Sequence, residues 1–213
     1  MKLEKDIFEL QKERLKKITA PSKPYLYNFL NKEIIVYPNV FYPGTDTELI
    51  IKTIKLNGNE SVLEPCSGTG VISLFISDKV KKITATDINP SAIENIKANI
   101  EKFNLKNIEV IKTDLFPETK EKFDLIIINL PYSDNKARDI VEKSMWDKDH
   151  KTTIKFLKKA REYIKENGKI YLSWANFADF NFIEKAAKEN NWNIKQISES
   201  NGNNYIFRVY ELK

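Results

Sequence analysis

The feature that most constrains the fold of this chain is a regular alternation of short apolar strands and longer amphipathic segments from residue 61 onward. Such an alternation is typical of a parallel sheet covered by helices on both faces, because each helix returns the chain to the start of the next strand. Five strands are predicted, at 61–63, 82–85, 108–112, 125–128 and 169–173. Helices are predicted at 71–77, 91–103 and 153–166. Asn89 and Pro90 mark the start of the second helix, and Gly168 is expected to end the third.

The C-terminal segment predicts an ending that a plain nucleotide-binding fold lacks. A helix over 182–190 precedes two strands, at 192–197 and 205–212, which the turn-forming residues 201–204 separate. Two strands joined by such a turn form an antiparallel hairpin. The expected fold is therefore α/β and Rossmann-like, with a seven-stranded, mostly parallel sheet, a C-terminal antiparallel hairpin and helices on both faces.

The first 32 residues are expected to form a helix and a linker ahead of a domain over 33–213. Apolar residues recur on one face of a helix over 2–18, and two prolines follow it. A strand over 33–37 is expected to pair with 40–42 in a hairpin. Thr45 or Asp46 is expected to cap the helix that follows, to about residue 55.

Composition limits the kind of protein. No apolar run approaches the ~20 residues that cross a bilayer, and the N-terminus lacks the apolar core of a signal peptide. Cys66, the only cysteine, cannot form an internal disulfide, so we expect a cytoplasmic protein without membrane contact. His150 stands alone, and no metal site is expected. The net charge of +5 comes mainly from lysines scattered among acidic residues, which favours a solvated surface over a nucleic-acid patch.

The first candidate site is a loop of small residues that follows the strand at 61–63. Its candidate ligand-binding residues are Glu64, Pro65, Cys66, Ser67, Gly68 and Gly70. The glycines allow a ligand to approach the backbone closely. A dinucleotide-binding loop has the pattern G-x-G-x-x-G, whereas this loop starts with a carboxylate. A carboxylate suits a cationic amino group and not a pyrophosphate, which favours the methionine part of S-adenosyl-L-methionine (SAM) over NAD.

Two further acids follow the next strands. Asp87 lies 23 residues beyond Glu64, and an acid about 20 residues past the glycine loop accepts hydrogen bonds from ribose hydroxyls in doubly wound folds. Ile88 lies next to it. Asp114 and Leu115 are expected to bind the amine edge and the face of an adenine. These four residues complete the predicted cofactor site.

The fourth motif, Asn129-Leu130-Pro131-Tyr132, directly follows an apolar strand and indicates the reaction. An amide-like nitrogen is a poor nucleophile because its lone pair is delocalised. Hydrogen bonds from its N–H groups to the Asn129 side-chain carbonyl and to a backbone carbonyl near Leu130 or Pro131 would orient that lone pair toward a methyl group. Tyr132 can stack on the planar group, and Pro131 stiffens the turn. We therefore expect Asn129, Pro131 and Tyr132 to be catalytic, with Asn129 also beside the cofactor.

These sites, in this order and spacing, resemble the HemK/PrmC group of glutamine-N5 methyltransferases within the small methyltransferase domain. The segment 40–49 is similar to the one that precedes the domain in that group, although Gly44 stands where an arginine is common. Leu130 replaces the first proline of the usual Asn-Pro-Pro-Tyr motif, a form seen in rRNA adenine dimethyltransferases. The resemblance implies a class I methyltransferase sheet with SAM lying across the carboxyl ends of its strands.

Several functions stay open at this point. The leading hypothesis is a SAM-dependent N-methyltransferase that acts on a side-chain amide, or a similar planar nitrogen, of a protein or small-molecule acceptor. The N-terminal helix would then cover the acceptor side as a lid or specificity element. The alternative is a nucleic-acid adenine-N6 methyltransferase, which the basic charge and Leu130 favour but the absence of a basic recognition extension does not. The third hypothesis is a non-catalytic SAM-binding subunit, which would have no need of Asn129. The fourth hypothesis is a nicotinamide oxidoreductase.

Overall fold

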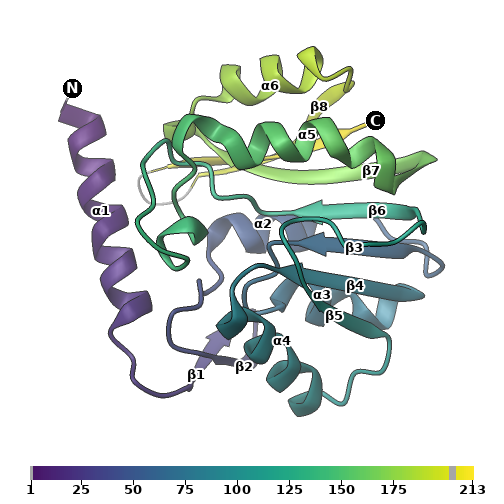
Figure 1. The fold of residues 1–213 in the computed structure, drawn as a ribbon, viewed down its shortest axis with the longest axis horizontal. Helices are drawn as coiled ribbons and strands as arrows, with labels where there is room; N and C mark the ends of the chain where they lie inside the picture. Colours follow the sequence, from purple (N-terminus) through teal and green to yellow (C-terminus); the bar gives the residue numbers. More distant parts are fainter. Residues whose placement is uncertain (1, 202–204) are drawn as a thin grey trace.

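The computed structural model describes the backbone of residues 2–201 and 205–213, and the side chains of residues 7–200 and 205–213. Its main sheet has seven strands in the order β5-β4-β3-β6-β7-β9-β8 (Figure 1). The strands are β3 (Ser61–Pro65), β4 (Lys82–Asp87), β5 (Ile108–Lys112), β6 (Phe123–Ile128), β7 (Ile164–Ala175), β8 (Ile194–Asn201) and β9 (Ile206–Leu212). Pairing is parallel from β5 to β7 and antiparallel for β7-β9 and β9-β8. The predicted seven-stranded sheet with its closing hairpin is confirmed.

The strand order reverses between β3 and β6. The chain moves outward from β3 to β4 and β5, then returns to place β6 on the other side of β3. In open α/β sheets a ligand crevice forms outside the carboxyl ends of the strands at such a reversal. Glu64, near the end of β3, and Asn129, just after β6, are therefore brought to the same edge of the sheet.

Helices cover both faces because the central strands bury alternate residues on opposite sides. Leu63, Ile126 and Ile170 pack with residues of α5 (Lys151–Tyr163) and α6 (Phe180–Glu189). Their neighbours Val62 and Ile127 pack with α2 (Thr45–Thr53) and α3 (Val71–Ile76). The amphipathic α4 (Pro90–Lys102) lies against β4 and β5. The central strands are accordingly rich in apolar residues on both faces, which is typical of parallel strands covered on two sides.

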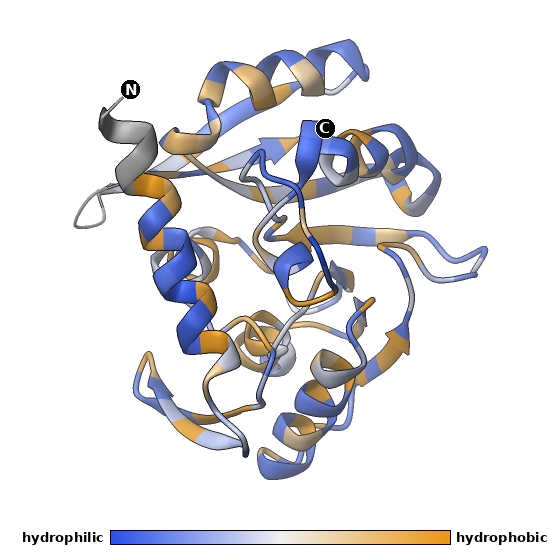
Figure 2. Ribbon diagram, turned by 60° about the vertical axis from the view of Figure 1, so that its left-hand side comes forward, coloured by the Kyte–Doolittle hydropathy of each residue, from blue (hydrophilic) through white to orange (hydrophobic). Residues whose placement is uncertain are grey.

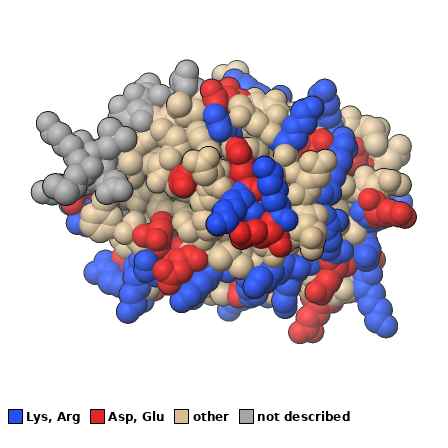
Figure 3. Space-filling view, turned by 90° about the horizontal axis from the view of Figure 1, so that it is seen from above, with Lys and Arg blue, Asp and Glu red and all other residues tan. Residues whose placement is uncertain are grey.

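The helix α1 (Lys2–Thr19) stands apart from these layers, across the edge at which the parallel strands end (Figure 1). Apolar and hydrophilic residues alternate along it, as expected for a helix with one buried face (Figure 2). Ile18 is its buried anchor and joins a small cluster with Met145 and Trp146. No helix among the described residues has the length and apolar character of a membrane span. Cationic and acidic side chains are interspersed on the face that Figure 3 shows.

The predicted strand at 33–37 is present as β2 (Lys32–Val36), but its predicted partner was wrong. It pairs with β1 (Tyr25–Phe29), which precedes it. The Asn99 and Asn95 side chains of α4 accept hydrogen bonds from the N–H groups of Ile35 and Tyr37, both at 2.8 Å. These amides satisfy the other edge of β2, so residues 40–42 turn away toward the pocket. The β1-β2 hairpin has strands on both sides of the predicted domain boundary at residue 32. The division of the chain at that residue stays a prediction.

Two helix boundaries also differ from the prediction. The N-cap of α2 is Gly44, without a side-chain cap, and both residues expected as the cap lie inside the helix. The helix α5 ends at Tyr163, and Gly168 lies within β7 and does not stop the helix. A Cβ at Gly168 would lie 2.6 Å from Ile164 Cγ1, so glycine is required where β7 bulges against β6. The N-cap of α4 at Asn89 is confirmed.

The C-terminal hairpin begins two residues later than predicted. Trp192 is a buried anchor ahead of β8, because its indole N–H donates to the Leu157 carbonyl at 2.8 Å. β8 then extends to Asn201. The rest of the predicted turn, residues 202–204, lies outside the described residues.

Candidate active site

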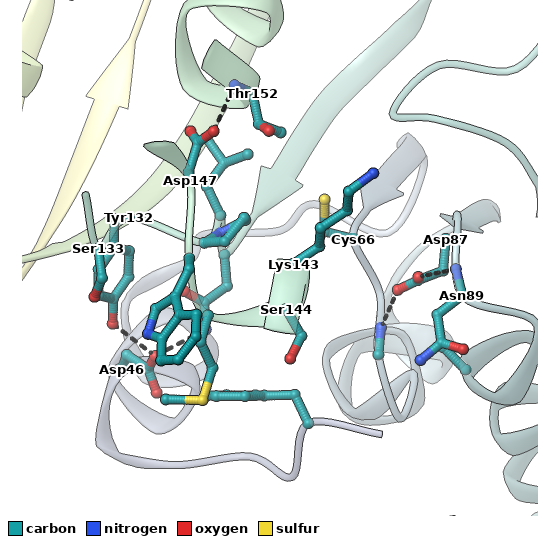
Figure 4. Close-up of a pocket in the computed structure, with 18 of the residues that line it drawn as sticks. Asp46, Cys66, Asp87, Asn89, Tyr132, Ser133, Lys143, Ser144, Asp147 and Thr152 are labelled. Atoms are coloured by element: carbon teal, nitrogen blue, oxygen red, sulfur yellow. Dashed lines mark hydrogen bonds between the residues drawn. The ribbon is translucent and has the colours of Figure 1, made fainter. Parts of the chain in front are cut away.

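A cavity of about 660 Å³ lies at the carboxyl ends of β3, β4 and β6 (Figure 4). This size is within the ~300–1,000 Å³ that is typical of small-molecule sites. The predicted site residues that line it are Glu64, Cys66, Ser67, Gly68, Asp87, Ile88, Asp114, Leu115, Asn129, Pro131 and Tyr132. Of the predicted residues, Pro65 and Gly70 do not line it. A Cβ at Gly70, whose φ is 72°, would lie 2.9 Å from Ile96 Cγ2, so Gly70 seats the loop against α4.

The glycine loop is tied to the end of β4. The Ser67 N–H donates to the Thr86 carbonyl at 3.0 Å, and the Gly68 N–H donates to Asp87 Oδ2 at 2.9 Å. Gly68 has a φ of 55°, which glycine adopts without strain. The loop and the ribose-binding acid predicted from sequence are therefore one rigid unit.

Asp87 keeps acceptor capacity for a ligand. Its carboxylate accepts from the Gly68 N–H and, at 2.8 Å, from the Asn89 N–H. A carboxylate has about four lone-pair sites, so roughly two are left for the hydroxyls of a ribose. Burial raises the pKa of Asp87, and its backbone hydrogen bonds oppose that shift. In Figure 4 the carboxylate lies between the loop and Asn89.

Glu64 is the most deeply buried acid of the cavity, with 2% of its surface exposed. The Ser73 N–H donates to Glu64 Oε2 at 2.9 Å, and the Ser73 hydroxyl donates to the same oxygen. Burial raises the pKa of Glu64 to about 8, against the hydrogen bonds from Ser73. A cationic amino group beside Oε1 would stabilise the ionised carboxylate, which fits the amino group of a methionine moiety.

Asp114 and Leu115, which are predicted to bind adenine, differ from Asp87 in their burial and in their partners. Asp114 is 54% exposed and forms an ion pair with Lys155 of α5 at 2.6 Å. Leu115 is buried, and its carbonyl accepts from the Thr86 hydroxyl at 2.6 Å. Ile88 is 40% exposed although apolar. An apolar side chain held at a cavity wall offers a surface for the face of a planar base.

Beyond the end of β6, Asn129 and Tyr132 share the carboxylate of Asp46, which was expected from the sequence as a helix cap. Asn129 Nδ2 donates to Asp46 Oδ2 at 3.0 Å, and the Tyr132 hydroxyl donates to the same oxygen at 3.1 Å. The Ser173 hydroxyl donates to Asn129 Oδ1 at 2.7 Å. Burial, followed by the charge of Asp46, raises the pKa of Tyr132 well above its usual value. The Tyr132 ring packs against Trp174, with centroids 5.3 Å apart.

Ser173 was missed although a signal for it exists. The parallel register pairs Ile128 of β6 with Leu172 of β7, so the residues that follow, Asn129 and Ser173, lie side by side. A polar residue at the end of the strand next to β6 was therefore a candidate partner of Asn129. Asp46 had a weaker signal, since it lies in the segment 40–49 that resembles the glutamine methyltransferases.

The helix α1 forms one wall of the cavity. Gln11 is buried, with its amide donating to the Ser133 hydroxyl and accepting from the Trp146 indole N–H at 3.2 Å. Arg14 donates to the Tyr42 carbonyl at 2.9 Å. A Cβ at Gly44 would lie 3.0 Å from Arg14 Nη2. An arginine is common at the position of Gly44 in the HemK/PrmC group. In this chain Gly44 instead leaves space for the side chain of Arg14, which comes from α1.

The segment after Tyr132 adjoins α1 and supplies a further part of the wall, which includes Met145 and Trp146. Asp147 is buried there and accepts from the N–H groups of Thr152 and Thr153 at 2.8 and 3.0 Å, which fixes the segment to the start of α5. Across the described residues, no group of three or more His, Cys, Asp or Glu side chains is placed to hold a metal ion.

A sheet that reverses its strand order beside a glycine loop, and closes with an antiparallel hairpin, is the architecture of the class I SAM-dependent methyltransferases. The fold and the cavity place this chain in that class, with SAM as the cofactor. The sequence profile of the methyltransferase small domain matches residues 33–205, and the chain belongs to that family.

Several relatives in sequence carry the names of methyltransferases. A Methanocaldococcus jannaschii protein that carries the name of a protein N5-glutamine methyltransferase is 34% identical over 144 residues, which cover 64% of this chain and 73% of that protein. The release factor glutamine methyltransferase of Borreliella burgdorferi is 28% identical over 204 residues, covering 87% of this chain and 66% of its own length. The ribosomal protein L11 methyltransferase of Lactobacillus johnsonii is 31% identical, and the match covers 71% of this chain but 43% of that protein.

Solved structures share the fold. A methyltransferase from Pyrococcus furiosus has a TM-score of 0.68 at 20% identity and covers 95% of this chain and 98% of its own. A 16S rRNA N2 G1207 methyltransferase from T. thermophilus, solved with AdoMet and guanosine, has a TM-score of 0.69 at 16% identity and covers 91% and 51% of the two chains.

Proposed function

We propose that this enzyme transfers a methyl group from SAM to a side-chain amide nitrogen, with a protein glutamine as the favoured acceptor. One observation carries the proposal. Asn129 lines the cavity, with its amide held by Asp46 on one end and by Ser173 on the other. The names of the sequence relatives support the choice of a glutamine amide.

The residues of the chain would act mainly by positioning. Bound SAM supplies a methyl group on a cationic sulfur. Asn129 Oδ1 has a second lone pair free for an acceptor N–H, and the backbone carbonyl near Leu130 would accept the other N–H. Two such bonds turn the nitrogen lone pair toward the methyl carbon. SAM would supply the methyl group together with a neutral sulfur leaving group, and the acceptor nitrogen would release one proton as its bond to the methyl carbon forms.

The predicted cofactor residues would bind SAM. Asp87 would bind the ribose hydroxyls, Glu64 the amino group, and Asp114 with Leu115 the adenine. Gly68 would let the ligand lie close to the loop. Pro131 keeps the turn after Asn129 stiff, and Tyr132 would contact the planar acceptor.

Nucleic-acid adenine is the less favoured acceptor. Binding of duplex or structured nucleic acid depends on cationic side chains that neutralise phosphates. Lysine and arginine are mixed with acidic residues on the face seen in Figure 3, and no continuous basic stripe crosses it.

The decisive experiment uses labelled SAM with fractionated cell extract and the purified enzyme. We expect label in protein, and N5-methylglutamine after complete enzymatic digestion of that protein, with both signals strongly reduced when Asn129→Ala is used. Label that enters RNA or DNA as N6-methyladenine, and that depends on Asn129, would replace the amide proposal by the adenine alternative.

A further inference from the structure

Asp46 is a buried carboxylate whose two oxygens serve different parts of the protein. It lies in the first turn of α2 with 3% of its surface exposed. Oδ1 accepts from the Thr47 N–H at 2.8 Å, a local bond at the start of the helix. Oδ2 accepts from Asn129 Nδ2 and the Tyr132 hydroxyl, which lie 83 and 86 positions further along the chain.

The start of α2 does not account for this arrangement. An acid in the first turn of a helix stabilises the free N–H groups even when it is exposed to solvent. Burying the charge costs free energy unless it is hydrogen-bonded. Here the bonds to Oδ2 come from the two side chains that the proposed mechanism places at the acceptor.

A carboxylate can only accept hydrogen bonds, and this decides how the Asn129 amide is oriented. The two ends of an asparagine amide have nearly the same shape but opposite hydrogen-bonding character. Next to Asp46 only the NH₂ end is favourable, so Oδ1 takes the other position, where Ser173 donates to it. With the amide reversed, an NH₂ group would face the N–H of the acceptor and repel it.

The charge of Asp46 adds to the effect of its position. Hydrogen bonds to an ionised acceptor are roughly twice as strong as neutral ones. Bonds in one chain polarise each other in a low-dielectric site. A stronger bond at Nδ2 therefore increases the negative charge on Oδ1, which makes that oxygen a better acceptor for the substrate N–H.

We propose that Asp46 is the positioning residue of the acceptor site, holding Asn129 with Oδ1 toward the acceptor nitrogen and polarising it. This inference rests on the proposed function. Asp46 does not contact the acceptor in this scheme and acts through Asn129 and Tyr132.

The variant Asp46→Asn keeps the size of the side chain and removes its charge. Its own amide can offer an N–H toward Asn129, so the orientation of Asn129 is no longer fixed. We expect kcat to fall by about 10- to 100-fold, the usual effect of losing a group that orients a site residue. KM for the acceptor and the Kd for SAM should each stay within about threefold of wild type, because only orientation at the reacting nitrogen is lost.

Glu48→Gln is the matched control. Glu48 lies in the same turn of α2, is 37% exposed and pairs with Lys52, away from Asn129. Its substitution also removes one carboxylate from the start of the helix, and kcat should stay at the wild-type value. Equal losses of kcat in the two variants, or loss of SAM binding in parallel with kcat in Asp46→Asn, would overturn the proposal.

A spectroscopic readout separates this inference from the identity of the acceptor. In ¹⁵N-labelled protein, the Asn129 Nδ2H₂ resonances are assigned by their loss in Asn129→Ala. We expect them to be shifted downfield and protected from exchange in wild type and Glu48→Gln, and to lose both properties in Asp46→Asn. This result would support the role of Asp46 even if no amide substrate were found. Resonances with ordinary shifts and fast exchange in wild type would overturn it, even if Asp46→Asn did not fold.

Discussion

Replacing Glu64 by Gln should remove the loss of stability at alkaline pH that Glu64 causes in the ligand-free enzyme. The pKa of Glu64 is about 8 in the native state, against 4.5 for an ordinary glutamate. Between these two values the native protein holds a proton that the unfolded chain has lost. The free energy of unfolding therefore falls as pH rises from 4.5 to about 8 and then levels off.

The magnitude follows from the size of the shift. Each pKa unit corresponds to about 1.36 kcal/mol, so the shift to about 8 gives an upper limit of roughly 5 kcal/mol at alkaline pH. Gln can accept both Ser73 hydrogen bonds through its carbonyl oxygen and carries no charge to bury. Glu64→Gln should match wild type near pH 4.5 and exceed it above pH 8.

The assay is urea unfolding followed by tryptophan fluorescence from pH 5 to 9, since Trp146, Trp174 and Trp192 are all buried. Glu48→Gln serves again as the control and should keep the wild-type slope. Saturating SAM should reduce the alkaline loss in wild type, because a cationic amino group offsets the buried charge, and binding near neutral pH should release protons. If Glu64→Gln and wild type had the same pH slope, Glu64 would not hold a proton in the folded enzyme and the reasoning would fail.

Four further substitutions test other parts of the site. Asp87→Ala should weaken SAM binding by roughly 1.5–3 kcal/mol in calorimetry through loss of a charged acceptor; unchanged affinity would end the ribose assignment. Asn129→Ala should leave SAM affinity nearly unchanged while turnover falls on the order of 10²-fold, and near-wild-type turnover would rule out planar-nitrogen positioning. Gln11→Ala removes the bonds from α1 to Ser133 and Trp146, so KM for the acceptor should change while SAM affinity does not; a parallel fall in SAM affinity would make α1 merely structural. Gly70→Ala should destabilise the fold by about 1–3 kcal/mol, from a positive φ and a Cβ against Ile96, and a wild-type urea midpoint would contradict this.

The central sheet and the place of its site could be predicted because they depend on local patterns. Strands buried on both faces are continuous apolar runs, and the reversal of strand order brings the residues after β3, β4 and β6 together. Residues at these strand ends, such as Asp87 and Asn129, are therefore identified by their place in the sequence alone.

What could not be predicted depends on side chains that arrive from distant parts of the chain. The partner of β2 was assigned wrongly because Asn95 and Asn99 of α4, some 60 residues away, occupy its other edge. Gly168 was assigned to a helix end because a glycine before a strand is common there, whereas its close contact with Ile164 exists only in the folded sheet. Asp46 has the sequence features of a helix cap, and only the fold reveals its bonds to Asn129.

The pKa of the Cys66 thiol reflects the surroundings of the glycine loop in the cavity. Its pKa is raised well above the usual value, first by burial and then by the charges of Asp87, Asp114, Asp147 and Glu64. Every charged group in that set is acidic, although Lys143, Lys148 and Lys151 line the same cavity. Burial and these acidic charges together keep the thiol protonated, so we do not expect Cys66 to act as a nucleophile.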